Sequence, residues 1–294
     1  MGQAVVTGIG SVASRAASAA HFTWSNITKF SSWVAHLTGI DTSRATTNVS
    51  WLSQVIVRLD LYLDSDLSTP SAVGSGFFLN IPGTTKDVIV TAGHNLIRPP
   101  KQGQSTPERV QKIDVRVKGA DGKWSTQSVT HTQCFIAEPY EKSPTAANAI
   151  YDYGVILLDR AKADESRDAL GFNIVLASMD LSSQSSGPGD VGLVSSVGGY
   201  PAVSNSEDGD PELETANGRF AQHAERQVHY TAASNQGMSG GPIWVNFGGE
   251  TVVVGIQYVF PHKYFRRRSR FSLGPLQTVT TMEINLVKVT KEHA

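Results

Sequence analysis

The chain has 294 residues, of which 40% are hydrophobic and 17% charged, so it can bury a full core as one large or two modest domains. Its net charge of −1 excludes an overall positive electrostatic field that would attract nucleic acid or an anionic membrane. The single cysteine, Cys134, excludes an intramolecular disulfide and favours a reducing compartment.

Residues 1–50 predict an extension ahead of the main body. They are rich in Ser, Ala and Thr, and Asp41 is their only acidic residue. Large apolar residues recur every three or four positions, which predicts an amphipathic helix with a face formed by Phe22, Trp24, Ile27, Phe30, Trp33, Val34, Leu37 and Ile40. We expect this face to pack on the protein body, in preference to docking on a membrane or partner, and a transit peptide is a third alternative.

The amino terminus also bears on location. Residues 1–20 contain no secretory hydrophobic region, because Gly, Ser and Arg interrupt them, and no apolar run approaches membrane-spanning length. These features favour an intracellular, cytoplasmic location over secretion.

From Gln54 onward the helical period gives way to short β-branched runs separated by turn residues. Many short strands with Gly, Pro and Asp between them favour a sandwich or closed barrels, and not alternating strands and helices. The first predicted set comprises residues 55–63, 76–81, 88–91, 112–118 and 154–158, and the second comprises residues 190–197, 227–231, 242–245 and 251–259.

A serine in a glycine-rich turn is the candidate nucleophile. Ser239 lies in the segment Gly237-Met238-Ser239-Gly240-Gly241-Pro242. The glycines allow a sharp turn and a close approach to a ligand, so the N–H groups of Gly237 and Ser239 could face a developing oxyanion. An ordinary glycine-rich turn is the alternative interpretation of this segment taken alone.

Two upstream residues complete a possible nucleophilic site. His94 follows an apolar strand that ends in small residues, which places its imidazole at the end of a strand as a general base. Asp152 directly precedes another apolar strand, where its charge needs a partner, and we expect that partner to be His94. Three residues in the order His, Asp, Ser would have to converge from distant segments to activate the serine.

Five motifs together make the chain similar to the trypsin-like (chymotrypsin-fold) serine proteases, with the disulfide-poor glutamyl endopeptidases as the nearest branch. The resemblance covers about residues 51 to 290, and the order and spacing of the motifs follow the family. The motifs are Gly74-Ser75-Gly76-Phe77-Phe78-Leu79, Thr91-Ala92-Gly93-His94, Asp152-Tyr153-Gly154-Val155-Ile156-Leu157-Leu158, Gly198-Gly199-Tyr200-Pro201 and Gly237-Met238-Ser239-Gly240-Gly241-Pro242.

The resemblance implies an all-β fold with two antiparallel six-stranded β-barrels and an active site in the cleft between them. It implies a first barrel over residues 51–168 with His94 and Asp152, and a second over residues 169–294 with Ser239. The amino-terminal helical extension would occupy residues 1–50, and a short terminal helix is expected over residues 282–288.

The resemblance also locates a substrate pocket at Ala233, Ser234 and Gln257. Ala233 stands where trypsin has the aspartate that selects Lys or Arg, so specificity for basic residues is not expected. Ser234 suits an acid-preferring pocket, but Gln257 replaces the histidine of glutamyl endopeptidases, which leaves the preferred residue open. Gln257 could still donate an amide hydrogen bond to a polar side chain.

The sequence therefore predicts a serine endopeptidase that acts on proteins or peptides through an acyl-enzyme. The alternative is a catalytically silent binding or scaffold protein with the protease fold, docked through its amino-terminal amphipathic segment. No Cys or His cluster has metal-ligand spacing, and phosphate-binding glycine loops and nucleic-acid motifs are absent, so no metal, cofactor or nucleic acid is expected.

Overall fold

The computed structural model describes most of the chain between residues 49 and 280. The predicted helices within residues 22–40 and over residues 282–288 lie outside the described residues. The structure describes residues 49–64, 67–80, 86–101, 103, 105–159, 171–174, 194–203, 210–224, 227–230, 232–247, 250–258 and 277–280.

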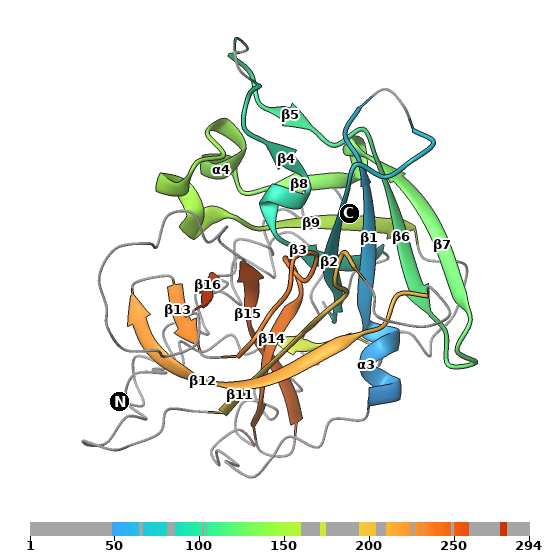
Figure 1. Cartoon of the computed structure of the whole chain (residues 1–294), viewed down its shortest axis with the longest axis vertical. Coiled ribbons are helices and arrows are strands. Elements are labelled where there is room, and N and C mark those ends of the chain that lie inside the picture. Colours follow the sequence, from blue (N-terminus) through green and yellow to red (C-terminus); the bar gives the residue numbers. More distant parts are fainter. Residues whose placement is uncertain are drawn as a thin grey trace, which may run out of the picture.

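The first part of the chain forms a curled sheet whose seven described strands run in the order β7-β6-β1-β2-β3-β9-β8. Each neighbouring pair is antiparallel. Figure 1 shows this sheet above the second one, in blue to green. Its strands are β1 (Ile56–Tyr62), β2 (Ala72–Leu79), β3 (Lys86–Thr91), β6 (Lys112–Lys118), β7 (Trp124–Thr130), β8 (Cys134–Ile136) and β9 (Gly154–Asp159).

The second sheet closes on itself. Its order is β10-β15-β14-β11-β12-β13-β16, and β16 pairs with both β13 and β15, so six described strands form a ring. The remaining strand, β10, adds to β15 in parallel. The strands are β10 (Asn173–Ile174), β11 (Val194–Gly199), β12 (Glu214–Ala224), β13 (Gln227–Tyr230), β14 (Pro242–Phe247), β15 (Glu250–Tyr258) and β16 (Gln277–Thr280).

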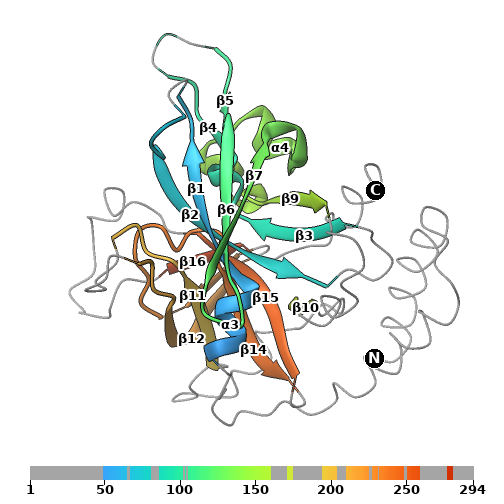
Figure 2. The same cartoon turned by 90° about the vertical axis from the view of Figure 1, so that its right-hand side faces the viewer.

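The all-β prediction is confirmed, whereas the number of strands in the first sheet and some individual strands differ from the prediction. The ring of the second sheet has the expected six strands, whereas the first sheet has seven strands within the described residues. Strands β7 and β8 were not among the expected runs: β7 pairs with β6 at one end of the first sheet, and β8 extends the other end beyond β9. Figure 2, turned by 90°, again shows the two sheets as separate layers in contact.

Short helical elements join the strands. Helix α3 (Val49–Val55) precedes β1 and buries Leu52 and Val55, so the first strand begins one residue later than expected. The other elements are α4 (Glu138–Lys142), the 3-10 turns η1 (Gly93–Asn95), η2 (His131–Gln133) and η3 (Ala146–Tyr151), and a small ribbon of β4 (Ile97–Arg98) and β5 (Glu108–Arg109).

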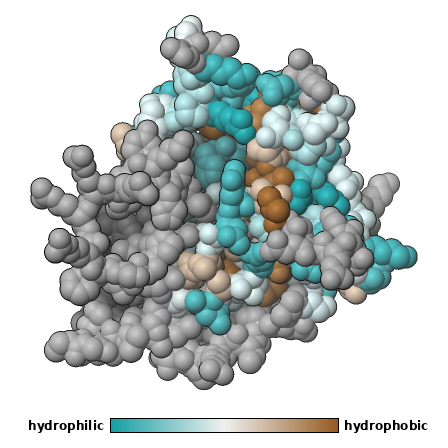
Figure 3. Space-filling view, in the orientation of Figure 1, coloured by the Kyte–Doolittle hydropathy of each residue, from teal (hydrophilic) through white to brown (hydrophobic). Residues whose placement is uncertain are grey.

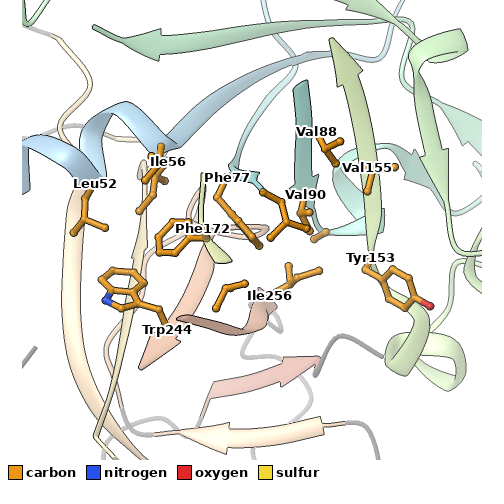
Figure 4. Packing of buried hydrophobic residues seen from close by; sticks show 14 of the residues in the cluster. Leu52, Ile56, Phe77, Val88, Val90, Tyr153, Val155, Phe172, Trp244 and Ile256 are labelled. Atoms are coloured by element: carbon orange, nitrogen blue, oxygen red, sulfur yellow. The ribbon is translucent and has the colours of Figure 1, made fainter. Parts of the chain in front are cut away.

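An apolar layer joins the two sheets. Figure 4 shows Phe77 and Val90 of the first sheet facing Trp244 and Ile256 of the second, with Phe172 between them. The Phe172 ring meets the rings of Phe77 and Trp244 at centroid distances of 5.7 and 5.9 Å. Aromatic contacts of this kind add to the free energy of burying apolar area, so the layer holds the two sheets against each other.

The first sheet is buried on both faces near its centre. Val88 and Val90 of β3 face the layer between the sheets, whereas Ile89 points into a second cluster inside the first sheet. Side chains alternate along a strand, so two-sided burial requires the continuous apolar run seen in β3. This rigid strand ends directly before the turn that carries His94.

The described surface is mainly polar. In Figure 3, hydrophilic and intermediate residues surround a narrow strip of hydrophobic ones. Among the described residues, only Leu67 and Val203 are large hydrophobic side chains with high exposure. No helix in the described part of the chain is long and apolar enough to cross a membrane.

Candidate active site

His94 and Asp152 are in direct contact. The Asp152 Oδ2 atom lies 2.7 Å from His94 Nδ1, and Oδ1 accepts a hydrogen bond of 2.7 Å from the His94 backbone N–H. The carboxylate is fully buried. Because a carboxylate oxygen accepts the bond at Nδ1, that nitrogen carries the proton, and the Nε2 lone pair is left to accept another.

Local backbone structure places both residues. His94 is the middle residue of η1, which is closed by the bond from Leu96 N–H to the Gly93 carbonyl, 2.8 Å. Asp152 lies at the start of β9 with φ −74° and ψ 65°, and the Tyr153 N–H donates to the Tyr151 carbonyl at 2.8 Å. These values describe an inverse γ-turn, which turns the carboxylate toward His94 as the strand begins.

Two tyrosines surround this pair. The Tyr258 ring meets the His94 ring edge to face, with 5.2 Å between centroids. Burial and the negative charge of Asp152 both raise the pKa of Tyr258. The same two causes raise the pKa of Tyr140, so both phenols stay neutral beside the carboxylate. The two tyrosine rings help to keep water away from Asp152, which strengthens the attraction between its carboxylate and the imidazole.

Ser239 is held through its backbone. Its carbonyl accepts hydrogen bonds from Ser75 N–H and from Asn95 Nδ2, each 2.9 Å. Asn95 directly follows His94, so the candidate nucleophile and base are linked through one side chain. Among the described residues, the Ser239 hydroxyl makes no hydrogen bond, and its bond to His94 is therefore not formed in this structure. Such contacts often tighten only when substrate binds.

The turn around Ser239 requires glycine. Gly237 and Gly240 have φ values of +97° and +89°, a region that other residues rarely adopt. A Cβ atom on Gly237 would also collide with the Ala202 backbone nitrogen. Within the described residues, the N–H groups of Gly237 and Ser239 donate no hydrogen bond. Both predicted oxyanion donors are therefore available to bind an oxygen atom of a ligand.

The predicted pocket residues occupy different environments. Ala233 is exposed, Ser234 is half-buried and Gln257 is fully buried. Both polar atoms of the Gln257 side chain lack a hydrogen-bond partner in the described structure. The Gln257 backbone flanks the nucleophile turn, since its carbonyl accepts from Gly240 N–H and its N–H donates to the Gly241 carbonyl, both at 2.8 Å.

Tyr230 is close to Ser234 and lies on the same sheet face as Gln257. Burial raises the pKa of Tyr230, and the neighbouring Ser234 side chain opposes that rise. Val228 and Gln257 both pair with Val279 of β16, so Tyr230, two residues after Val228, lies on the same sheet face as Gln257.

Sequence reasoning missed four residues of this site: Asn95, Tyr140, Tyr258 and the role of Ser75. Asn95 and Tyr258 are direct neighbours in sequence of predicted site residues, which is the only signal that could have indicated them. In the described part of the chain, no cluster of three or more His, Cys, Asp or Glu residues could hold a metal ion.

Comparisons with known proteins identify the fold. No protein-family model matches this sequence, and no curated protein matches it in sequence. A solved structure of a Glu endopeptidase in complex with MPD has a TM-score of 0.53 at 14% identity, covering 80% of this chain and 88% of that chain. The chain therefore has the chymotrypsin-like double-barrel fold of trypsin-like serine proteases. The resemblance inferred from the five sequence motifs is confirmed for the fold.

Two further solved structures show a weaker likeness. A thermostable serine protease, AL20, from an extremophilic microorganism has a TM-score of 0.49 at 13% identity, covering 78% of this chain and 91% of that one. The protease Anisep from Arthrobacter nicotinovorans has a TM-score of 0.46 at 14% identity, with coverage of 78% and 90%.

Proposed function

We propose that the protein is a serine endopeptidase that cleaves peptide bonds through an acyl-enzyme on Ser239. The observation that carries this proposal is the buried Asp152 carboxylate, which binds both the backbone and the imidazole of His94. A carboxylate in this position fixes the tautomer and orientation of a general base. A buried acid that binds a histidine, together with a serine in a glycine-rich turn linked to that histidine through Asn95, favours nucleophilic catalysis over a purely structural role.

In the proposed reaction, each of these groups has a separate role. His94 Nε2 takes the proton of the Ser239 hydroxyl as its oxygen attacks the carbonyl carbon of the substrate. The negative charge that develops on the carbonyl oxygen is stabilised by the N–H groups of Gly237 and Ser239. His94 then gives the proton to the leaving amine, and water releases the acyl group in a second round. Asp152 holds the imidazole in place and stabilises the imidazolium.

We also propose that Gln257 contacts the substrate side chain that precedes the cut. A buried amide without partners costs roughly 1–3 kcal/mol, which a substrate group could recover. The amide offers a donor and an acceptor without net charge, so it suits a polar side chain. In a Gln257→Leu variant, we expect the preference for polar residues to fall by about 10- to 100-fold, in proportion to that cost.

Digestion of casein followed by mass spectrometry tests both proposals. Wild-type protein should produce defined peptides, the Ser239→Ala variant should produce none, and the residue before each cut reports the specificity. If a folded wild-type protein cuts neither casein nor a diverse peptide library, the endopeptidase proposal fails. The alternative is then a silent protease-fold binding protein docked through its amino-terminal segment.

A further inference from the structure

A buried polar cluster lies between the two sheets, beneath the candidate active site. Ser75 of β2 and Thr91 of β3 are fully buried, and Asn95 of η1 is 4% exposed. All three belong to the first sheet or the turn that follows it, whereas the group that they surround is the backbone of Ser239. Thr91 lies between Val90 and Ala92, two buried residues of the apolar layer that joins the sheets. A set of hydrogen bonds in such surroundings holds specific atoms in place, which apolar packing alone does not do.

The Asn95 carboxamide is the centre of the cluster. Its Nδ2 atom donates to the Ser239 carbonyl at 2.9 Å and to Thr91 Oγ1 at 2.9 Å. Thr91 Oγ1 in turn donates to the Ser75 carbonyl at 2.7 Å, and Ser75 N–H donates to the Ser239 carbonyl at 2.9 Å. The Ser239 carbonyl therefore has two donors from the opposite sheet, and one of them belongs to the residue that follows His94.

We propose that Asn95 is a positioning residue that sets the distance between His94 and Ser239, an inference that rests on the proposed function. Asn95 follows His94 in a tight turn, so its backbone moves with the general base. Its amide fixes the carbonyl of the nucleophile, so the two reacting residues share one short hydrogen-bonded link. Displacing a reacting group by about 1 Å can cost roughly 100-fold in rate, which makes such a link valuable.

Packing against Gly74 keeps the Asn95 side chain in this orientation. A Cβ atom on residue 74 would lie 2.6 Å from Asn95 Nδ2 and 2.7 Å from its Cγ. Gly74 has no such atom, so the carboxamide lies directly on the β2 backbone. The three atoms nearest to such a Cβ all belong to Asn95, so an alanine at residue 74 would push the amide away from the Ser239 carbonyl.

Substitutions of Asn95 provide the first test. Asn95→Asp keeps the shape and removes the N–H donors, and Asn95→Ala removes the group. In both variants we expect kcat to fall by about 100-fold while KM changes by less than about threefold, because alignment is lost and substrate binding is retained. In the Asn95→Ala variant, the acidic limb of the pH profile should keep its position, since this change adds no charge and leaves the contact between His94 and Asp152 untouched.

Asn80→Ala is the matched control. Asn80 also joins distant segments through its amide, donating to the Gly171 carbonyl at 2.8 Å and accepting from Gly171 N–H at 3.0 Å. We expect this variant to lose thermal stability with kcat per folded molecule unchanged. If Asn95 variants behave in the same way as Asn80→Ala, the role of Asn95 is only structural and the proposal is overturned.

A double variant tests the link independently of Asn95 chemistry. Gly74→Ala alone should lower kcat, because it displaces the Asn95 amide, whereas adding Gly74→Ala to Asn95→Ala should cost little more. Costs that add fully in the double variant would contradict the proposal. Kinetics on wild type separate the two hypotheses: an inactive, folded wild type overturns the endopeptidase function and this inference, whereas active Asn95 and Gly74 variants overturn this inference alone.

Discussion

The two sides of the candidate active site are held by different means. On the first sheet, a side chain does the positioning: the Asp152 carboxylate binds the imidazole and the backbone of His94. On the second sheet, the positioned group is the backbone: the carbonyl of Ser239 accepts one bond from a backbone N–H and one from the Asn95 side chain, and Gly237 and Gly240 adopt positive φ values.

This difference indicates where each side is vulnerable. The acid and base can lose function through an isosteric change of a side chain that leaves the fold intact. The nucleophile turn depends on backbone shape, so substitutions there act first on folding. Variants on each side should therefore separate side-chain control, which acts on rate, from backbone control, which acts on stability.

The largest effect is expected for Asp152→Asn. The shape is retained, but the amide cannot hold His94 in the tautomer that accepts a proton from serine, so kcat should fall by about 10⁴-fold. The midpoint of thermal unfolding should change little. Steady-state kinetics with a peptide substrate and thermal unfolding followed by circular dichroism measure both quantities. A loss of less than about tenfold in kcat would show that Asp152 does not control the base.

Gly237→Ala should act on stability instead. Positive φ and the collision with the Ala202 backbone together should lower the free energy of unfolding by about 3–5 kcal/mol, from strain and overpacking. Gly122→Ala is the control, because Gly122 has φ +78° with no atom within 4 Å of the place that a methyl group would take, and about 1–2 kcal/mol is expected there. Urea unfolding compares them, and equal losses would argue against the tight backbone packing of the turn.

The pH dependence of activity tests the role of His94, which Asp152 holds in place. Protonated His94 cannot accept the proton of Ser239, so kcat/KM should fall on the acidic side by about tenfold per pH unit. Hydrolysis rates in buffers of constant ionic strength give the profile. An activity that stays flat across the acidic range in which the protein remains folded would exclude His94 as the base.

The last prediction concerns Cys134 of β8, whose side chain is buried in the cluster inside the first sheet and which bears on local opening and not on activity. Burial raises the pKa of the Cys134 thiol to about 12, so the reactive thiolate is disfavoured in the folded protein. Alkylation of native protein at about pH 8 should be at least about 100-fold slower than alkylation in urea. Equal rates would mean that the strand carrying Cys134 opens easily, contrary to a rigid first sheet.

Much of the fold could be predicted because its central strands carry continuous apolar runs. The segment containing Val88 and Val90 is buried on both faces, so its hydrophobicity is visible without any knowledge of its partners. Strand β12 (Glu214–Ala224) was missed for the opposite reason: Phe220 is its only large apolar residue, and its strand conformation depends on pairing with β11 and β13.

The candidate active site likewise contains residues with a local sequence signal and residues whose roles depend on tertiary contacts. His94 and Asp152 stand in recognisable local segments, and their contact across 58 positions was expected from those segments. Asn95 and Tyr258 carry no such pattern, because their roles come from neighbours brought close by folding: the Ser239 carbonyl for one and the His94 ring for the other. A single sequence does not encode those contacts as a local signal.

Covalent labelling of Ser239 tests the proposed catalytic site without any need for a known substrate. A fluorophosphonate probe reacts with a serine only when a neighbouring base activates it. We predict that folded wild-type protein is labelled at Ser239, whereas urea-denatured wild type and the Ser239→Ala variant are not labelled. Equal labelling of wild type and Ser239→Ala, or an unlabelled wild type with an intact fold, would contradict the proposed catalytic site.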